Sequence, residues 1–407
     1  MHGAFSIAAW LIALAWLYKL AEAAWGLPSV PNLLEARFDG SPAGSPSVAV
    51  VVPARNKAAG VGACLESLLG QDYSNLRVIA LDDRSTDETG AIMDRAAAAH
   101  AERLEVMHVA VLPAGWLGKT HAMATAARQA IAEHGPDYLL FTDADIVFRR
   151  DALRRSLVAA VASEADHFVV MPTTVAKSRG EAMLLSFFQT MSMWGVRTWR
   201  VADPRAKRDA IGVGAFNLIR RDVYQRLGGF DATPMEVLED LTLGRRVKAA
   251  GLRQQVATAP GMVSVHWAEG VAGLVNGLTK NMFAVFRFRP VLVIGAAVWL
   301  MLFCFGPLVF LGVRGARAPG AITLACIAGL YGLSSRTSRI SPVYAGLYPV
   351  STALVLYSMA RSMAVTLQDG GVTWRGTFYP LAELRRNARA VGHGQDGKNS
   401  NGTEGGS

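Results

Sequence analysis

The sequence is poor in cysteine and in charge. Three cysteines occur in 407 residues, and Cys64, Cys304 and Cys326 lie too far apart to form a metal-binding spacing or a disulfide framework. Their scarcity fits a reducing compartment. Charged residues make up 18% of the chain and hydrophobic residues 51%, so the chain is more apolar than an ordinary soluble domain. This balance indicates membrane segments.

Two common nucleotide-binding motifs are also absent. Gly60 and Gly62 begin a G-x-G pattern, but Leu65 occupies the position of the third glycine, and both glycines fall inside an expected helix rather than in a turn. Gly118, Lys119 and Thr120 imitate the end of a P-loop, but Pro113 stands where that motif needs its first glycine. These departures exclude a dinucleotide fingerprint and P-loop chemistry.

The net charge of +9 comes with no nucleic-acid-binding pattern, because the sequence has no basic helix with interleaved aromatics and no zinc or recognition-helix motif. The basic residues instead cluster beside hydrophobic segments, as at Lys280, Arg287 and Arg289 or at Arg336 and Arg339. This placement fits anionic headgroups on a cytoplasmic membrane face. We therefore expect a membrane partner and no nucleic acid, and no sequence feature indicates a protein partner.

Hydrophobic runs lie at both ends of the chain. Residues 4–20 are long enough for one crossing, with Trp10, Trp16 and Tyr18 available as interfacial anchors. A cleaved signal peptide is the alternative, but no Lys or Arg precedes the run. We expect an N-terminal transmembrane helix over residues 1–24.

Three further apolar runs, at 290–313, 321–333 and 342–367, predict C-terminal transmembrane segments over residues 290–367. The first and third are long enough to cross, whereas the second is short enough for a thin span or a re-entrant piece. The sequence therefore predicts three or four spans in total.

Residues 45–265 alternate between strand and helix patterns with short connections. Strands are expected at 47–54, 76–83, 104–112 and 137–145, and helices at 59–71, 88–101 and 119–135. This alternation predicts an α/β domain with a mostly parallel, doubly wound sheet that binds ligands outside the carboxyl ends of its strands.

Polar clusters follow several of these strands. Asp143 and Asp145 lie two residues apart, so on a strand both carboxylates would point the same way, as suits Mg²⁺ or Mn²⁺; a simple turn is the alternative. Asp82 and Asp83 could accept hydrogen bonds from a nucleoside, with helix capping by the residues that follow as the alternative.

Two more charged groups are candidates for chemistry. Lys119 at a helix start would attract a diphosphate, and a solvated lysine is the alternative. Glu239 and Asp240 open a helix, where acidic residues are common, but a carboxylate there could also act as a general base.

Residues 181–199 could form either a core-packed helix or one lying in the membrane interface, and residues 266–289 present the same choice, with an amphipathic interface helix expected. Residues 368–407 are expected to be a cytoplasmic-facing tail, disordered after about residue 390.

Six motifs between residues 47 and 250 resemble, in their order and spacing, the GT-A family 2 glycosyltransferases: VVPARN, LDDRSTD, GWLGK, DAD, GAFNLIRR and LED. The flanking membrane segments and VTWRGTFY at 372–379 resemble the lipid-acceptor branch, which includes ceramide glucosyltransferases and hopanoid-associated glycosyltransferases. The resemblance implies a GT-A, Rossmann-like catalytic domain and a multi-pass enzyme of the inner (plasma) membrane with a cytoplasmic catalytic domain.

The resemblance also implies residue roles. Pro53, Ala54, Arg55, Asn56, Asp82 and Asp83 would contact the nucleoside of the donor. Lys119 would approach the diphosphate, Asp143 and Asp145 would hold Mg²⁺ or Mn²⁺, and Asp240, with Glu239 beside it, would be the base.

The implied reaction moves one sugar, with inversion, from a nucleotide sugar such as a UDP-sugar to a lipid hydroxyl. Transfer to a polyprenyl phosphate or polysaccharide is an alternative, and a non-catalytic membrane scaffold or transporter is a further one.

One departure from the family pattern limits the acceptor. Processive members and ceramide glucosyltransferases carry a Q/R-x-x-R-W motif after the base, whereas residues 277–286 here read GLTKNMFAVF. This difference disfavours a polymerase and a ceramide acceptor. Arg375 could supply charge near the donor, with interfacial anchoring by Trp374 and Tyr379 as the alternative, and His266 is left out of the metal set as a structural histidine.

If all three C-terminal segments crossed the membrane, the Arg-rich tail would lie opposite a cytoplasmic catalytic domain, against the positive-inside tendency. We therefore expect two C-terminal spans plus a re-entrant segment.

Overall fold

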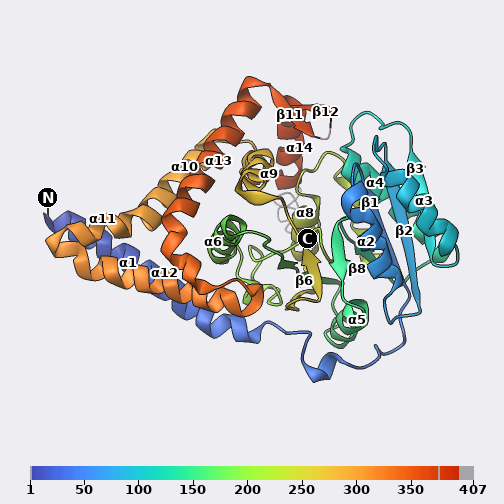
Figure 1. The fold of residues 1–407 in the computed structure, drawn as a ribbon, viewed down its shortest axis with the longest axis horizontal. Helices are drawn as coiled ribbons and strands as arrows, with labels where there is room; N and C mark the ends of the chain where they lie inside the picture. The colour runs from blue at the N-terminus through green and yellow to red at the C-terminus, as the bar shows by residue number, and fades with distance from the viewer. Residues whose placement is uncertain (1, 375, 394–407) are drawn as a thin grey trace, which may run out of the picture.

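The computed structural model describes residues 2–374 and 376–393, and it places an α/β domain at one end and long apolar helices at the other (Figure 1). The main sheet has the order β3-β2-β1-β4-β8-β6-β9, in which β8 alone runs antiparallel to its neighbours. Its strands are β1 (Val48–Ala54), β2 (Leu76–Asp83), β3 (Leu104–Val109), β4 (Tyr138–Phe141), β6 (His167–Met171), β8 (Asn217–Arg220) and β9 (Gln254–Thr258). The predicted mostly parallel GT-A-like sheet is confirmed.

Helices cover both faces of the sheet because its central strands are apolar on both sides. Val50 and Val52 share a buried cluster with Leu65 of α2, whereas Ala49 and Val51 pack with α4 on the opposite face. The helices of this domain are α2 (Ala58–Leu69), α3 (Thr89–Ala99), α4 (Gly118–His134), α5 (Ala152–Ala162), α7 (Arg221–Arg226) and α8 (Glu239–Ala249). A smaller sheet joins β5 (Ile146–Phe148), β10 (Val263–Val265) and β7 (Thr173–Thr174).

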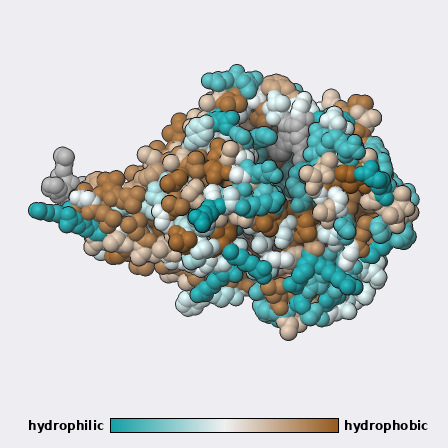
Figure 2. All heavy atoms as spheres, in the orientation of Figure 1, coloured by the Kyte–Doolittle hydropathy of each residue, from teal (hydrophilic) through white to brown (hydrophobic). Residues whose placement is uncertain are grey.

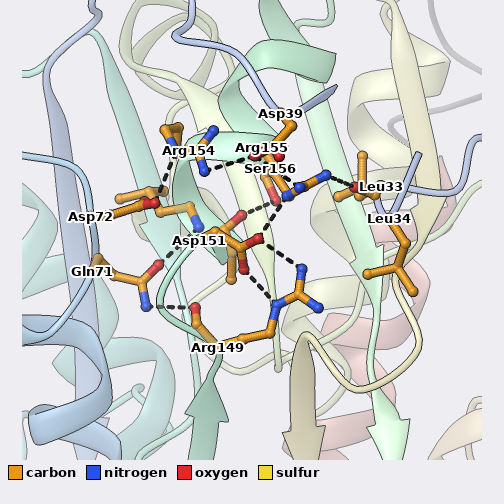
Figure 3. A network of polar contacts seen from close by, with 12 residues as sticks. Leu33, Leu34, Asp39, Gln71, Asp72, Arg149, Asp151, Arg154, Arg155 and Ser156 are labelled. Atoms are coloured by element: carbon orange, nitrogen blue, oxygen red, sulfur yellow. Dashed lines mark hydrogen bonds and ion pairs between the residues drawn. The ribbon is translucent and has the colours of Figure 1, made fainter. Parts of the chain in front are cut away.

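The chain before β1 is tied to α5 by a polar network (Figure 3). The buried guanidinium of Arg155 donates to the carbonyl oxygen of Leu33 over 3.0 Å and to Asp151 over 2.7 Å. Arg154 bridges Asp39 and Asp72, each over 3.0 Å. These contacts fix the segment that connects the N-terminal helix to the catalytic domain.

Among the described residues, four helical segments are long and apolar enough to cross a membrane, at Phe5–Ser29, Pro290–Gly312, Arg314–Ser338 and Pro342–Gln368. They contain α1 (His2–Gly26), α10 (Pro290–Leu300), α11 (Gly306–Gly312), α12 (Arg317–Ser338) and α13 (Tyr348–Gln368). A wide π-turn over Met301–Phe305 joins α10 to α11. On the face that Figure 2 shows, apolar side chains predominate along these helices, and hydrophilic residues lie at their outer tip.

Two expectations about these helices are wrong. The run at 321–333 is the middle of the 22-residue helix α12, so its shortness gives no reason to call it re-entrant. Trp16 is fully buried, and its indole N–H donates to the carbonyl oxygen of Phe303 over 3.1 Å, so it packs helix against helix instead of anchoring at the interface.

Contacts at both ends of α13 reach the catalytic domain. Arg339, between α12 and α13, donates to the carbonyl oxygen of Pro260 over 2.9 Å. After α13, a hairpin of β11 (Gly371–Trp374) and β12 (Thr377–Pro380) and the helix α14 (Leu381–His393) return to the same domain, where Tyr379 contacts Gly118. At the far end of the molecule, Ser6 of α1 donates to the carbonyl oxygen of Gly315, between α11 and α12.

Two further helices lie between the catalytic domain and the apolar helices. In α6 (Arg179–Gly195) every residue from Glu181 to Phe187 is buried, which favours the core-packed alternative for this segment. α9 (Gly270–Val285) packs between α6 and α13, and its backbone N–H at Phe283 donates to the Ser362 hydroxyl over 3.0 Å.

Candidate active site

A cavity of about 530 Å³ opens at the carboxyl ends of β1, β2 and β4. It brings together nine of the residues predicted from the sequence: Pro53, Ala54, Arg55, Asp83, Lys119, Asp143, Asp145, Glu239 and Asp240. Asn56 and Asp82 are not in its lining, and Arg375 lies outside the described residues. Most of the predicted set therefore meets in one cavity, at the sheet edge where ligands bind in folds of this kind.

Asn56 and Asp82 instead support the loops around the cavity. Asn56 has a φ of 50°, and its side-chain oxygen accepts a hydrogen bond from the N–H of Thr86 over 2.8 Å. Asp82 accepts from the N–H of Ser85 over 3.3 Å, as a turn-stabilising aspartate does. Their positions indicate a structural role, in contrast to the predicted nucleoside contact.

Asp83 forms the wall of the cavity at one end. It is buried, pairs with Arg84 over 2.8 and 3.1 Å, and has the guanidinium of Arg55 at 3.7 Å. Gly118 packs so closely that a Cβ added there would overlap the Asp83 carboxylate. The glycine at the start of α4 is therefore a steric requirement of this wall.

Lys119 connects two acidic groups across the cavity. Its ammonium lies 2.6 Å from Oδ1 of Asp143 and 2.6 Å from Oε1 of Glu239. Burial alone would lower the pKa of Lys119, but the charges of Asp143, Glu239 and Asp240 outweigh it and raise that pKa. The lysine therefore stays cationic beside the space where an anionic ligand would lie.

Asp143 and Asp145 reach the cavity from a turn and not from a strand. β4 ends at Phe141, so the expected strand over 137–145 is wrong at its carboxyl end, and the alternation of strand side chains does not explain why both aspartates line the cavity. Gly214 fits against Asp143, since an added Cβ there would lie 2.5 Å from Oδ2. The turn and this glycine aim the two carboxylates.

The two carboxylates of this turn are suitable ligands for a hard divalent cation. Two carboxylates with polar exposure are what Mg²⁺ and Mn²⁺ take from a protein when substrate phosphates and water complete the shell. Within residues 2–374 and 376–393 no group of three or more His, Cys, Asp or Glu side chains is placed to hold a metal alone. Asp145 is ion-paired with Lys57, which sequence reasoning missed although it directly follows the PARN motif.

Asp240 sits at the first turn of α8, as expected. Its burial and the charge of Glu239 raise the pKa of Asp240 to about 7, against the opposing effect of Lys119. A Cβ at Gly212 would overlap the Asp240 backbone, so the glycine-rich segment before β8 allows α8 to approach. A carboxylate with this pKa is suited to accept a proton near neutral pH.

The remaining wall comes from segments late in the chain. Trp267, Asn281 and Tyr379 all line the cavity. Tyr379 is buried and its hydroxyl accepts from the N–H of Gly118, so it does not act as the interfacial anchor that the sequence suggested as one alternative. Tyr379 ends the VTWRGTFY motif, but the sequence did not place it or the other two residues in this cavity, because their position depends on how α9 and the β11–β12 hairpin pack against the domain.

His266 does not line the cavity, and its Nε2 lies 3.3 Å from Glu181. Glu181 also accepts from the N–H groups of Lys177 and Gly270, each over 2.7 Å, and these bonds lower its pKa to about 2 although burial alone would raise it. This arrangement agrees with a structural histidine that holds the segment before Trp267.

Comparisons with known proteins agree with this geometry. The family described as "Glycosyl transferase family 2" matches residues 49–228. The 4,4'-diaponeurosporenoate glycosyltransferases of Staphylococcus aureus strains USA300 and RF122 are each 23% identical, with 83% of this chain and 89% of the relative covered. A mannosyltransferase from Pyrobaculum calidifontis, solved with GDP-Man and Mn²⁺, is 20% identical, has a TM-score of 0.54 and covers 90% of this chain and 99% of its own.

The last of these likenesses shows a shared GT-A-like fold. The fold and the matched family define a glycosyltransferase, an enzyme that moves a hexose. More narrowly, residues 49–228 are similar to the family 2 glycosyltransferases. The expected hopanoid and ceramide branch stays a prediction.

Proposed function

We propose that this enzyme moves a single sugar from a nucleotide sugar, expected to be a UDP-sugar, to the hydroxyl of a membrane lipid. The observation that carries the proposal is that Asp83, Lys119, Asp143, Asp145 and Asp240 line one cavity in a chain that also has helices long enough to cross a membrane. Asp83 and the β1 carboxyl end would bind the nucleoside. Lys119, a cation at the start of α4, would bind the diphosphate.

Asp143 and Asp145 would hold Mg²⁺ or Mn²⁺, which, when bound, neutralises charge on the diphosphate. Side chains of the protein would carry out the proton transfer and stabilise the leaving group. The Asp240 carboxylate takes the proton of the acceptor hydroxyl, whose oxygen attacks the anomeric carbon as the bond to the diphosphate breaks. Lys119 stabilises the departing phosphate charge, and the anomeric configuration inverts.

The charge of the cavity wall favours an uncharged acceptor. Glu236, Glu239 and Asp240 all line the cavity. Burial, with a smaller contribution from Glu239, raises the pKa of Glu236, so a further anion is already disfavoured there. A polyprenyl phosphate would add a charge to this wall, and it would not need a base. A hydroxyl adds no charge to this wall, and unlike a phosphate it needs a carboxylate to take its proton.

A carboxylic acid acceptor is a second candidate, because the Staphylococcus aureus relatives are named for diaponeurosporenoate. The two products differ in chemistry. Mild alkali releases free sugar from a glycosyl ester but leaves a glycoside intact. We expect a glycoside, so the sugar should stay on the acceptor after alkali treatment.

The experiment uses the full-length protein in detergent, labelled UDP-glucose, UDP-N-acetylglucosamine or GDP-mannose, MnCl₂ and a lipid extract of the cells that make it. The expected result is an alkali-stable glycolipid seen by mass spectrometry with at least one donor. If no donor binds in calorimetry with Mn²⁺ and no lipid is labelled, the proposed function is wrong.

We also propose that three segments cross an inner (plasma) membrane and that α13 does not. Since Arg339 and Tyr379 both contact the catalytic domain, the two ends of α13 belong on the same side as that domain. Ser6 and Gly315 would meet on the opposite side. α1, the α10–α11 segment and α12 would cross, the catalytic domain would be cytoplasmic, and the Arg-rich tail would be cytoplasmic too, as the positive-inside tendency favours.

Membrane-impermeant thiol labelling of intact cells tests this topology. We expect a cysteine introduced at Gly315 to be labelled from outside, and cysteines at Ser341 or Asp369 to be labelled only after lysis. Labelling of Asp369→Cys in intact cells would contradict the assignment of α13.

A further inference from the structure

The wall of the cavity contributed by α9 contains an unpaired polar atom. Asn281 lines the cavity, and its side-chain oxygen Oδ1 is buried without a hydrogen-bond partner among the described residues. Buried polar atoms almost always have partners, because leaving one unpaired costs folding free energy. A substrate group that fills the cavity would provide the missing partner.

The position on the helix makes this residue unusual. Leu274 and Leu278 precede it by seven and three residues, lie on the same face of α9, and are buried at 2% and 3% exposure. The next position of that face would ordinarily be apolar. An asparagine there weakens the packing of α9, so its presence is explained best by a contact made with a bound ligand.

The surroundings of Asn281 indicate which substrate it meets. The residues expected to bind the donor come from the sheet and from α4, whereas Asn281 comes from a helix that packs against α6 and α13. Trp267 precedes the same helix, is 44% exposed, and its ring meets Phe188 of α6 edge to face at 5.7 Å. An apolar ring and an amide that line the same cavity suit a lipid whose head carries hydroxyls.

We propose that Asn281 binds the acceptor, accepting a hydrogen bond from a hydroxyl of the lipid head other than the one that Asp240 deprotonates. The acceptor is then a lipid with at least two hydroxyl groups in its head, and Trp267 forms the apolar side of its subsite. This inference rests on the proposed function and adds to it a substrate class and a specificity-determining residue.

The test compares Asn281→Leu with a matched variant, Asn276→Leu, on the same helix. Leucine keeps the volume and continues the apolar face, so the Asn281 variant should unfold at a temperature no lower than the unaltered protein. Asn276 is exposed and pairs with Arg361 over 2.7 Å, away from the cavity lining. Apparent KM for a detergent-dispersed lipid extract is measured for each, together with the donor Kd by calorimetry.

We expect Asn281→Leu to raise the acceptor KM by about tenfold, as one lost hydrogen bond to a buried hydroxyl does, with the donor Kd within about twofold of normal. Asn276→Leu should change neither. The glycosylated lipid, identified by mass spectrometry, should contain a free hydroxyl beside the glycosidic bond. An unchanged acceptor KM, a donor Kd weakened by the same factor, or an acceptor with a single hydroxyl overturns the role of Asn281. Failure of the unaltered enzyme to bind or transfer any sugar would instead contradict the proposed function itself.

Discussion

The hydroxyl of Tyr379 accepts a hydrogen bond from the backbone N–H of Gly118 over 3.3 Å, although the two residues are 261 positions apart. Gly118 begins α4 beside Asp83 and directly precedes Lys119. The β11–β12 hairpin therefore closes the end of the cavity where the donor is expected to bind.

Removing this hydroxyl should weaken donor binding. Tyr379→Phe loses one neutral hydrogen bond, worth about 1 kcal/mol, so we expect the donor KM to rise by about fivefold. Tyr379→Ala, which also removes the buried ring, should raise it further. The adjacent Phe378 is 50% exposed, and Phe378→Ala serves as the control. Equal donor KM values for all three variants would show that the hairpin does not shape the donor site.

Lys57 should compete with a metal for Asp145. The ammonium of Lys57 is paired with that carboxylate, and both side chains are partly exposed, at 27% and 29%. A pair of this kind is worth up to about 1 kcal/mol, so Lys57→Gln should tighten Mn²⁺ binding to the donor-free protein by up to about fivefold. Calorimetry with MnCl₂ measures this, and Lys207→Gln, at an exposed position, is the control. Weaker Mn²⁺ binding in Lys57→Gln would rule out competition.

Gly214 should be intolerant of a side chain. Alanine would bring Cβ to 2.5 Å from Oδ2 of Asp143 and push the carboxylate aside. Overpacking of this kind costs about 1–3 kcal/mol, so we expect affinity for donor and Mn²⁺ to fall by between about fivefold and about 150-fold. Gly40→Ala is the matched control, because no atom of the described residues lies within 4 Å of its added Cβ. Normal affinity in Gly214→Ala would mean that Asp143 is not held in place by this contact.

Activity and stability should respond to pH in opposite directions. Burial and Glu239 raise the pKa of Asp240 to about 7, so the base is protonated below that pH and transfer should fall about tenfold per pH unit there. The folded protein holds this proton more tightly than the unfolded chain, so the group's stabilising contribution is complete at low pH and is lost as pH rises through about 7. Asp240→Asn should remove this loss. Rate and Tm profiles from pH 5 to 9 check both trends, and a rate that is flat across this range would contradict the base assignment.

The sequence predicts the sheet well because its strands and helices have strong local signals. The runs at 47–54 and 76–83 are apolar on both faces, which only a covered parallel strand tolerates, and both became central strands. Ligands bind outside the carboxyl ends of parallel strands, and this rule predicts that Asp83, Lys119 and Asp240 lie near one another. All three line one cavity. Each of these expectations needed only the order of elements along the chain.

What the sequence did not predict depends on packing. The short turn after β4 and the contact with Gly214 direct Asp143, and neither follows from strand alternation. Asn281 and Tyr379 reach the cavity from α9 and from the β11–β12 hairpin, whose docking is set by tertiary contacts. The contacts of Arg339 and Tyr379 with the catalytic domain likewise distinguish α13 from the other long helices, although its length and composition match theirs.

The most direct test of the account is the rate of sugar transfer by Asp240→Asn at saturating donor. The substitution keeps the size of the side chain but removes the proton acceptor, and loss of a general base lowers the rate by about 10²–10⁴-fold. The donor Kd should stay close to that of the unaltered enzyme, and Asp222→Asn, an exposed residue paired with Arg220, should be fully active. Full transfer by Asp240→Asn with saturable donor would contradict the assignment of Asp240 and, with it, transfer to a hydroxyl by this mechanism.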